Sequence, residues 1–540
     1  MALTADLRRG IDSIRDYLFG GGFPDPMSNA EQLSYLFFFY LVEGMDADNI
    51  LKARATKQAY ISLFDGEWTL RNPLNASNQG QTAVPAARMR WSSWARGMTG
   101  DALVRWVRDE VFAFYAVMAE RSAMNFMDGA RLGIDEPTVL TQVVDLIDQL
   151  HLDQADADTK GDLFEHVLRQ IKKAGELGQF RTPRHVIRAV VRMVNPSIGE
   201  TVYDPAAGTA GFLVAAYNHI RLAHSSASAI DTVELDGKPV VRGWGDKLST
   251  SMSARLGNGT FYGNDVDPKM VRLATMNLTL RGLPNVRILK RNALTTTLER
   301  ADLAVLGLPL DGYDVVLANP PFSGTLDRDR IVDDVKVGTT AATELLFLRY
   351  MLNVLKLGGR AGVIVPEGVL FGSTNAHKEL RRQLVENNNV HAVMSLPGGV
   401  FQPYSGVKTS VLFFTKGGRT EHVQFLHADA DGYKLDAQHD TAIEADDLPG
   451  LEAAYAGRAQ HLGEWQARDA EAEWTEKWWF ADAAQLRAND FNLSASRYRP
   501  LSKAQAVHRD PRELLGELRA IEAELLEEID ALDAMLAEGV

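Results

Sequence analysis

The chain has 540 residues, 46% hydrophobic and 8% aromatic, which is typical of a soluble globular protein with two or three domains. It contains no cysteine, which excludes disulfide frameworks and thiolate metal sites. The net charge of −14 resides in residues 421–540, which hold 26 acidic and 11 basic residues and leave residues 1–420 at +1. This charge balance excludes a protein whose whole surface binds nucleic acid. Residues 1–420 could still contact DNA together with a more basic partner.

The first residues lack the apolar core of a signal peptide, and the longest apolar run, residues 35–42, is too short to cross a bilayer. We therefore expect a cytoplasmic protein without a membrane span.

Residues 1–155 are predicted to form a helical N-terminal domain, because apolar residues recur there at helical spacing. Examples are Ile11, Ile14 and Leu18 near its start and Leu140, Val143 and Ile147 near its end. The segment has no catalytic constellation. Its Trp and Phe residues are interpreted as core, and a partner-docking or DNA-facing surface remains an alternative.

Two helices are predicted over residues 161–171 and 185–194, on either side of the segment Gln179 to Pro183. Thr182 before Pro183 fits a helix start, where free backbone N–H groups can receive a carboxylate. A plain N-cap explains the pattern equally well.

Residues 201–213 read as a strand, a glycine-rich turn and a helix. Gly208 and Gly211 allow the backbone to pass close to a ligand, and Asp204 can pin the turn or accept a ligand amine. The turn matches neither the dinucleotide fingerprint nor the P-loop, which favours a smaller cofactor that carries adenosine.

Residues 221–259 look like an insertion that contains a hairpin with an Asp-Gly centre. The second strand, residues 260–265, ends in acids: Asp265 is expected to take the two ribose hydroxyls of a nucleoside and Asp267 to cap the next helix. A third strand, residues 286–290, leads to Asn292, which could reach an adenine edge.

The fourth strand, residues 313–318, delivers Asn319-Pro320-Pro321-Phe322 to the carboxyl edge of a parallel sheet. The lone pair of an exocyclic base amine is conjugated with the ring until acceptors pull its hydrogens out of plane. The Asn319 side-chain oxygen and the Pro320 carbonyl can be those acceptors, and Phe322 can stack on the base. Such a base must first leave its helix. An ordinary strand that ends in a Pro-Pro turn is the alternative for this motif alone.

A polar loop over residues 323–340 is expected to be a lid, a DNA contact or simply solvated. Strands at 361–366, 390–396 and 409–415 follow, the last without a crossover helix and therefore antiparallel. The prediction is a doubly wound sheet of seven strands.

Residues 421–511 are read as a mixed acidic region in which Trp474, Trp478 and Trp479 pack. Residues 512–540 are predicted to be an amphipathic helix that lies against its own domain or a partner. Its apolar stripe is Leu514, Leu518, Ile521, Leu525, Ile529 and Leu532.

In combination, these segments resemble the modification subunit of Type I restriction-modification systems, a group of N6-adenine DNA methyltransferases. The resemblance rests on the helical residues 1–155, residues 179–183, residues 204–212, residues 319–322, residues 397–409, residues 492–498 and the terminal helix. Three positions differ from the usual family pattern. Arg181 stands where an aromatic is usual, Asp265 where Glu is usual, and Asn292 where Asp is usual.

The resemblance implies a Rossmann-like methyltransferase sheet of seven strands, the last antiparallel, with a catalytic domain over residues 156–420. It implies S-adenosylmethionine as cofactor, no metal, and catalysis by Asn319, Pro320, Pro321 and Phe322. The cofactor-binding residues would be Gln179, Phe180, Thr182, Pro183, Asp204, Ala207, Gly208, Thr209, Gly211, Asp265 and Asn292.

The implied function is methylation of adenine N6 in double-stranded DNA, with the target adenine flipped out, in a Type I or related phage-defence complex. A specificity subunit would bind the terminal helix, and a second copy of the chain and a motor-nuclease subunit are further implied partners. The alternatives are an RNA or protein-glutamine amino-methyltransferase and a non-catalytic scaffold of a defence complex.

Overall fold

The computed structural model describes residues 5–57, 59–72, 82–121, 127, 129–152, 157–169, 182–283, 285–322, 324–402, 405–436, 439–469, 473–500, 515, 519, 522, 523 and 526. The chain divides into two compact units: residues 1–466 with 477–498, and residues 467–476 with 499–540. In the second unit, the described positions from 515 to 526 have helical backbone. The predicted apolar stripe of this terminal helix lies outside the described residues.

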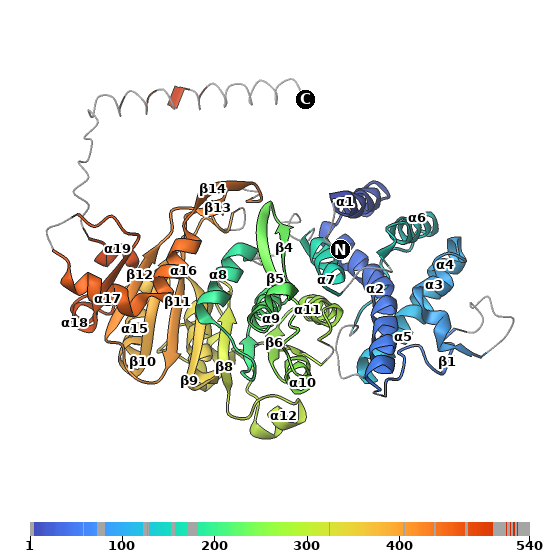
Figure 1. The fold of residues 1–540 in the computed structure, drawn as a ribbon, viewed down its shortest axis with the longest axis horizontal. Helices are drawn as coiled ribbons and strands as arrows, with labels where there is room; N and C mark the ends of the chain where they lie inside the picture. The colour runs from blue at the N-terminus through green and yellow to red at the C-terminus, as the bar shows by residue number, and fades with distance from the viewer. Residues whose placement is uncertain are drawn as a thin grey trace. The chain divides into compact units, whose positions relative to one another are not determined.

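The first unit begins with helices, as predicted (Figure 1). These are α1 Ala5–Gly20, α2 Pro26–Thr56, α3 Trp91–Trp94, α4 Gly100–Trp106, α5 Phe112–Arg121, α6 Pro137–Asp148 and α7 Ala157–Arg169. A 3-10 turn, η1 Ala86–Met89, and a π-helical turn, η2 Val107–Val111, interrupt them, and a short antiparallel pair, β1 Glu67–Thr69 and β2 Ala83–Pro85, was not predicted. No helix within the described ranges is long and apolar enough to span a bilayer.

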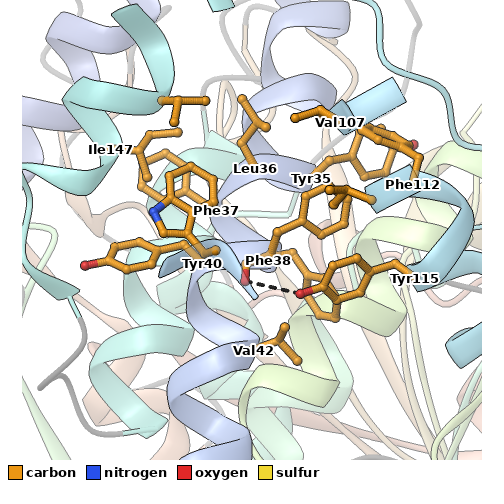
Figure 2. Packing of buried hydrophobic residues seen from close by; sticks show 14 of the residues in the cluster. Tyr35, Leu36, Phe37, Phe38, Tyr40, Val42, Val107, Phe112, Tyr115 and Ile147 are labelled. Atoms are coloured by element: carbon orange, nitrogen blue, oxygen red, sulfur yellow. Dashed lines mark hydrogen bonds between the residues drawn. The ribbon is translucent and has the colours of Figure 1, made fainter. Parts of the chain in front are cut away.

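Helix α2 is the centre of this helical part. Its residues from Tyr35 to Val42 are all buried, so the helix is apolar on every side because other helices surround it. Figure 2 shows Phe112 and Tyr115 of α5 beside the rings of α2. Tyr115 stacks on Phe39 at 4.3 Å between ring centroids and donates to the Phe39 carbonyl at 3.4 Å. The aromatic residues that the sequence assigned to a core therefore form one.

The same core extends to α11 (Pro268–Leu280), which belongs to the sheet-bearing part of the chain. Arg272 of α11 donates to Glu31 at 2.6 Å and to the Tyr35 hydroxyl at 2.7 Å, both on α2. These three side chains are buried, and a buried charge is stable only when it is paired in this way. The helices before residue 169 and the sheet are thus joined within one unit.

Among the described residues, the central sheet has nine strands rather than the seven predicted. Its order is β15-β12-β10-β11-β9-β8-β3-β6-β7. In chain order, the strands are β3 Val202–Asp204, β6 Phe261–Asp265, β7 Arg287–Lys290, β8 Tyr313–Ala318, β9 Leu355–Pro366, β10 Asn388–Ser395, β11 Thr409–Lys416, β12 His422–His427 and β15 Trp478–Asp482. All seven predicted strands are present, and β12 and β15 extend the sheet beyond β10.

Strand β11 is antiparallel to both of its neighbours, β9 and β10, as predicted, but it is not the last strand. Strand β12 runs parallel to β10, and β15 runs antiparallel to β12. Trp478 and Trp479 are buried, as predicted, and they lie on this added edge strand.

Helices cover both faces of the sheet. Helices α8 (Arg184–Val194) and α9 (Gly211–Ala223) contact each other and the strands β8 and β3, and α13 (Thr343–Val354) contacts α15 (Asn375–Asn387). From β3 the chain crosses to β6 on one side, and from β8 it crosses to β9 on the other. Right-handed crossovers that run in opposite directions place their helices on opposite faces of the sheet. The direction in which successive strands are added therefore reverses between β3 and β8. Ligands of open α/β sheets bind at such a switch point.

Shorter elements complete the first unit. They are η5 Ala227–Ala229, α10 Thr250–Asn258, α12 Arg300–Val305, η6 Arg328–Arg330, η7 Asp333–Val335, α14 Glu367–Phe371, β13 Asp431–Tyr433, β14 Ala442–Asp446, α16 Leu448–Ala456, α17 Arg458–Ala467, α18 Ala483–Ala488 and α19 Ala495–Tyr498. The polar loop after β8 thus contains two 3-10 turns, and Val335 within it is buried.

The insertion at 221–259 contains the predicted hairpin, β4 Ile230–Leu235 with β5 Lys238–Gly243. Arg242 on β5 pairs with Asp162 of α7 at 2.6 Å, and Lys238 pairs with Asp446 of β14 at 2.6 Å. Together with α8 and α9, the hairpin lines a cavity of about 400 Å³. The insertion is therefore tied by ion pairs to both α7 and β14.

Candidate active site

Strand β3 ends at Asp204, whose side chain is buried. Its Oδ1 atom accepts the backbone N–H of Ala206 at 3.0 Å, which pins the turn that follows, as the sequence suggested. Burial raises the pKa of Asp204 to about 8, and the nearby charge of Asp265 adds to the shift. The carboxyl group is therefore poised to ionise when a cation approaches it.

The turn after Asp204 uses left-handed backbone at Gly208 (φ 51°) and Ala210 (φ 66°). A Cβ added to Gly208 would meet no atom within 4 Å, so space is open beside this turn. A Cβ on Gly211 would lie 3.0 Å from Ile187 Cδ1, so α9 packs tightly on α8 at its start. Gly208 thus provides the free approach to the backbone that the sequence predicted, and Gly211 provides close helix packing.

Asp265 at the end of β6 holds the same turn. Its Oδ2 accepts the N–H of Gly208 at 3.0 Å, and its Oδ1 accepts the N–H of Asp267 at 2.9 Å. A carboxylate has about four lone-pair positions, so it can accept further donors, such as hydroxyl groups, besides these backbone N–H groups. Burial raises the pKa of Asp265, and backbone hydrogen bonds from Asp267, Gly208 and Val266 oppose this. Asp267 caps α11 by accepting the N–H of Lys269 at 2.8 Å, as predicted.

Asn264 is a residue that the sequence reading missed. Its Nδ2 donates to the Pro205 carbonyl at 2.9 Å and to the Arg291 carbonyl at 3.3 Å, and its Oδ1 accepts from the Tyr203 hydroxyl. It therefore ties together the chain segments that follow β3 and β7. The signal was an amide inside an otherwise apolar strand, beside the more conspicuous Asp265.

Asn292 follows β7, in the turn that begins where Arg291 N–H donates to the Asp265 carbonyl at 2.9 Å. Its Oδ1 accepts the N–H of Leu294 at 3.0 Å, so the side-chain oxygen already stabilises its own turn. Contact with an adenine edge remains a prediction, in which the amide nitrogen is the more available group.

Asn319 follows β8, directly across the switch point from β3. Its Nδ2 donates to Thr182 Oγ1 at 2.8 Å, although the two residues are 137 positions apart. Its Oδ1 is buried and has no hydrogen-bond partner among the described residues. A buried acceptor without a donor costs free energy, on the order of 1–3 kcal/mol, and is unusual unless a ligand supplies the donor.

Thr182 does not cap α8, which excludes the plain N-cap explanation. The helix begins at Arg184 with Pro183 as its N-cap residue and without a side-chain cap. The buried Thr182 hydroxyl instead orients the amide of Asn319. This link joins the segment before the sheet to the motif after β8.

Phe322 is buried and meets Phe401 edge to face, with ring centroids 5.1 Å apart and an interplanar angle of 89°. Phe401 belongs to the segment 397–409 that the sequence also singled out, and this segment therefore lies beside the Asn-Pro-Pro-Phe turn. Pro320 is buried and Pro321 is exposed. Stacking of Phe322 on a base remains a prediction.

The described site residues form two groups on neighbouring strands. Asp204, Ala207, Gly208, Thr209, Gly211 and Asp265 surround the turn after β3, whereas Thr182, Pro183 and residues 319–322 gather after β8. Strands β3 and β8 are hydrogen-bonded with Tyr203 opposite Val316, so the two groups share one edge of the sheet. Gln179 and Phe180 lie outside the described residues.

Comparison with known proteins identifies relatives over most of the chain. The N-6 DNA Methylase family model matches residues 155–506. The chain is 28% identical over 504 residues to the Type I restriction enzyme EcoEI methylase subunit of Escherichia coli, covering 89% of this chain and 92% of that protein. It is 29% identical over 432 residues to the Type I restriction enzyme EcoKI methylase subunit of Escherichia coli K12, covering 74% of each.

Solved structures of similar fold come from the same kind of system. A chain from a structure of type I R-M complex assembly and conformational transition is 26% identical, with a TM-score of 0.65 and coverage of 100% of this chain and 99% of that one. The type I restriction-modification methyltransferase subunit from Streptococcus thermophilus shares the fold at 18% identity and a TM-score of 0.61, covering 91% and 98%. The resemblance predicted from the sequence is confirmed.

Proposed function

This chain belongs to the N-6 DNA methylase family, and from that premise we propose that it methylates adenine N6 in DNA with S-adenosylmethionine. It would act as the modification subunit of a Type I restriction-modification or related phage-defence complex. The observation that carries the proposal is the buried, unpartnered Oδ1 atom of Asn319 at the switch point of the sheet. An exocyclic amine supplies the donor that this acceptor lacks.

The residues around the turn after β3 fit S-adenosylmethionine. The open space beside Gly208 admits a ligand against the backbone, the free lone pairs of Asp265 suit the two ribose hydroxyls, and Asp204 suits a cationic group. The bound cofactor presents a methyl group on a sulfonium, which is a good leaving group. The role of Asn292 at the adenine edge and of Gln179 and Phe180 belongs to the same proposal.

In the transfer, Asn319 Oδ1 and the Pro320 carbonyl accept the two hydrogens of the flipped adenine amine, which localises the nitrogen lone pair. The nitrogen attacks in line, the new N–C bond forms as the S–C bond breaks, and one amine proton leaves to solvent. Phe322 stacks on the base. Orientation and these two acceptors supply the catalysis, without a covalent enzyme intermediate.

Thr182 is proposed to position Asn319 rather than to touch the reacting atoms. Thr182→Val keeps the side-chain shape but removes the hydroxyl, so Asn319 can rotate away from its productive orientation. We expect kcat to fall about 10-fold to 100-fold, with the Kd of S-adenosylmethionine unchanged, in a single-turnover methyl-transfer assay. Thr182→Ser, which keeps the hydroxyl, is the control. A raised cofactor Kd with unchanged kcat would instead assign Thr182 to cofactor binding.

Cofactor binding should depend on pH through Asp204. Its pKa of about 8 means that the carboxylate, which attracts the sulfonium and ammonium groups, is populated only as pH rises toward that value. We expect the Kd measured by calorimetry to fall about tenfold between pH 6.5 and 8, since each pH unit below a pKa reduces the ionised form tenfold. Asp204→Asn should bind more weakly and lack this component, and an identical pH profile in the variant would contradict the assignment.

The same shift has an opposite effect on the ligand-free protein. Because the pKa of Asp204 lies above its ordinary value of 3.8, the folded state holds the proton more tightly than the unfolded state. Its contribution to stability is therefore present below about pH 4 and is lost progressively as pH rises through 8. Bound cofactor would offset this loss.

The proposed partners are double-stranded DNA and a specificity subunit that binds the terminal helix, with a second copy of the chain and a motor-nuclease subunit in the full complex. In the loop after β8, Arg328 and Arg330 are exposed and make no ion pair with the described residues. Unpaired cations beside the base-binding edge suit DNA phosphates. The division into domains at residues 155, 420 and 511 remains a prediction.

The test is transfer of labelled methyl from S-adenosylmethionine to unmodified DNA, by this chain alone and with its co-purifying partner. Label on adenine N6 only with the partner would support a catalytic subunit that borrows its specificity. Label with the chain alone would contradict the partner role of the terminal helix. Cofactor binding without label on DNA in either case would favour RNA or protein substrates, or a scaffold.

A further inference from the structure

Three side chains outside the proposed active site converge beside the first turn of α8. They are His185 of α8, Asp431 of β13, and His439 in the connection between β13 and β14. One nitrogen or oxygen from each lies within 4.8 Å of the others. His185 Nε2 is 2.7 Å and His439 Nε2 is 2.9 Å from the same atom, Asp431 Oδ2.

This cluster is closed to solvent. The side chains of Asp431 and His439 are 0% and 1% exposed, and that of His185 is 12% exposed. The ring of Tyr433 stacks on His185 with centroids 4.4 Å apart, and the Tyr433 N–H donates to Asp431 Oδ1 at 3.2 Å. Stacking and a hydrogen bond to the other carboxylate oxygen are the kind of support that orients metal ligands.

The donor atoms in the cluster suit a metal cation. Asp431 Oδ2 lies 2.7 Å from the Nε2 atom of His185 and 2.9 Å from that of His439. A carboxylate buried with two imidazoles forms the kind of oxygen and nitrogen donor set that divalent transition metals bind.

The hydrogen bonding of the His439 ring also points to a metal ligand, independently of the distances. Neither of its ring nitrogens has a hydrogen-bond partner among the described residues, even though Nε2 lies 2.9 Å from Asp431 Oδ2. The ring N–H is therefore not directed at the carboxylate. An imidazole nitrogen without a hydrogen atom offers a lone pair, which is what a metal ion requires.

We propose that His185 Nε2, Asp431 Oδ2 and His439 Nε2 bind a divalent transition-metal ion, and that Zn²⁺ is the ion whose preferences they fit. Two imidazoles and one carboxylate form a common zinc ligand set. Ligand atoms about 2.0–2.1 Å from a tetrahedral zinc lie about 3.3 Å from one another. The two imidazole nitrogens would therefore have to move by less than about 1 Å from Asp431 Oδ2 to reach that spacing. Water completes the coordination.

The ion would join two parts of the unit that are far apart in the sequence. His185 and Asp431 are 246 positions apart, and His185 is three residues after Thr182, which holds Asn319. The metal would clamp the β13 and β14 hairpin onto the start of α8 and so steady the segment that leads into the proposed active site. Its role is structural and does not depend on the methyl-transfer proposal.

The experiment uses untagged full-length protein treated with chelator and then titrated with Co²⁺, a zinc substitute whose visible absorption reports nitrogen and oxygen coordination. We expect one Co²⁺ per chain, displaced by Zn²⁺, with a rise of several degrees in Tm as zinc is added. In His439→Ala, the affinity for Co²⁺ should fall at least about 100-fold.

His185→Gln separates a metal site from a hydrogen-bonded tether. Glutamine can still donate to Asp431, so a tether would survive, whereas the zinc-dependent rise in Tm should disappear. His461→Ala is the matched control, because His461 also pairs with a carboxylate, Glu464 at 3.0 Å, on an exposed helix. Absence of bound metal in the wild-type protein, or equal metal binding in His185→Gln, would overturn the proposal, whatever the methyltransferase activity.

Discussion

Replacing Asn319 with alanine should lower kcat for DNA methylation about 10²-fold to 10³-fold, the loss typical for one preorganised polar contact to a reacting group. The Kd of S-adenosylmethionine should change by less than about twofold, since an interaction made only in the transition state affects kcat and kcat/KM alike. The reason is geometric. Asn319 Oδ1 is the buried acceptor for which no partner exists among the described residues.

Single-turnover transfer at saturating cofactor and DNA gives the rate, and equilibrium dialysis gives the cofactor Kd. Asn319→Asp keeps an acceptor oxygen and should retain more activity than Asn319→Ala. Asn353→Ala, which removes an exposed amide that donates to the Asp334 carbonyl at 2.7 Å, controls for loss of an asparagine elsewhere. Unchanged methylation by Asn319→Ala would remove this residue from the mechanism.

Replacing Asp265 with alanine should raise the Kd of S-adenosylmethionine about 100-fold, equal to about 2.7 kcal/mol. Two effects combine in this change. The ribose hydroxyls lose a charged acceptor, and the N–H groups of Gly208 and Asp267, at 3.0 and 2.9 Å from the carboxylate, lose theirs. Hydrogen bonds to a charged group contribute about 1.5–3 kcal/mol each, so this loss is large.

Calorimetric titration of each variant with the cofactor measures this effect. Asp265→Glu should bind within about tenfold of the wild-type protein, because one added methylene keeps the charge and the acceptors. Asp267→Ala should lower the Tm through loss of the α11 cap while it leaves the cofactor Kd nearly unchanged. If Asp265→Ala bound the cofactor normally, another residue would have to hold the ribose.

Most of the sheet could be predicted because the residues within each strand indicate that strand. Each of the seven predicted strands contains apolar residues, and five of them end at or directly before Asp, Asn or Pro. Strands β12 and β15 were missed because they lie in residues 421–511, which the sequence assigned only to a mixed acidic region without naming its strands. Their buried faces, with Phe425 beside Trp479, become apparent only once the edge of β10 is there to pair with them.

Within the candidate site, too, local features were predictable from the sequence and long-range contacts were not. The strand-end positions of Asp204, Asp265 and Asn319 follow from the order of apolar runs and polar ends. The Thr182 interpretation could not be settled from sequence, since a Thr-Pro pair also begins helices, and the partner of its hydroxyl is 137 residues away. The amide of Asn264 within an apolar strand was a weak signal, because its partners, Tyr203 and Pro205 on one segment and Arg291 on another, are distant in the sequence.

The sequence by itself determined the features that depend on neighbouring residues: the glycine-rich turn after β3, the Asp236-Gly237 hairpin, the Asp267 cap and the Asn-Pro-Pro-Phe turn at a strand end. Each is set by local backbone preferences and short-range hydrogen bonds. Only the tertiary structure decided which of these meet. It placed Thr182 on Asn319, the inserted hairpin on α7, and His185 with Asp431 and His439. These contacts join residues far apart in the chain, and they form only when strand order and helix packing bring those residues together.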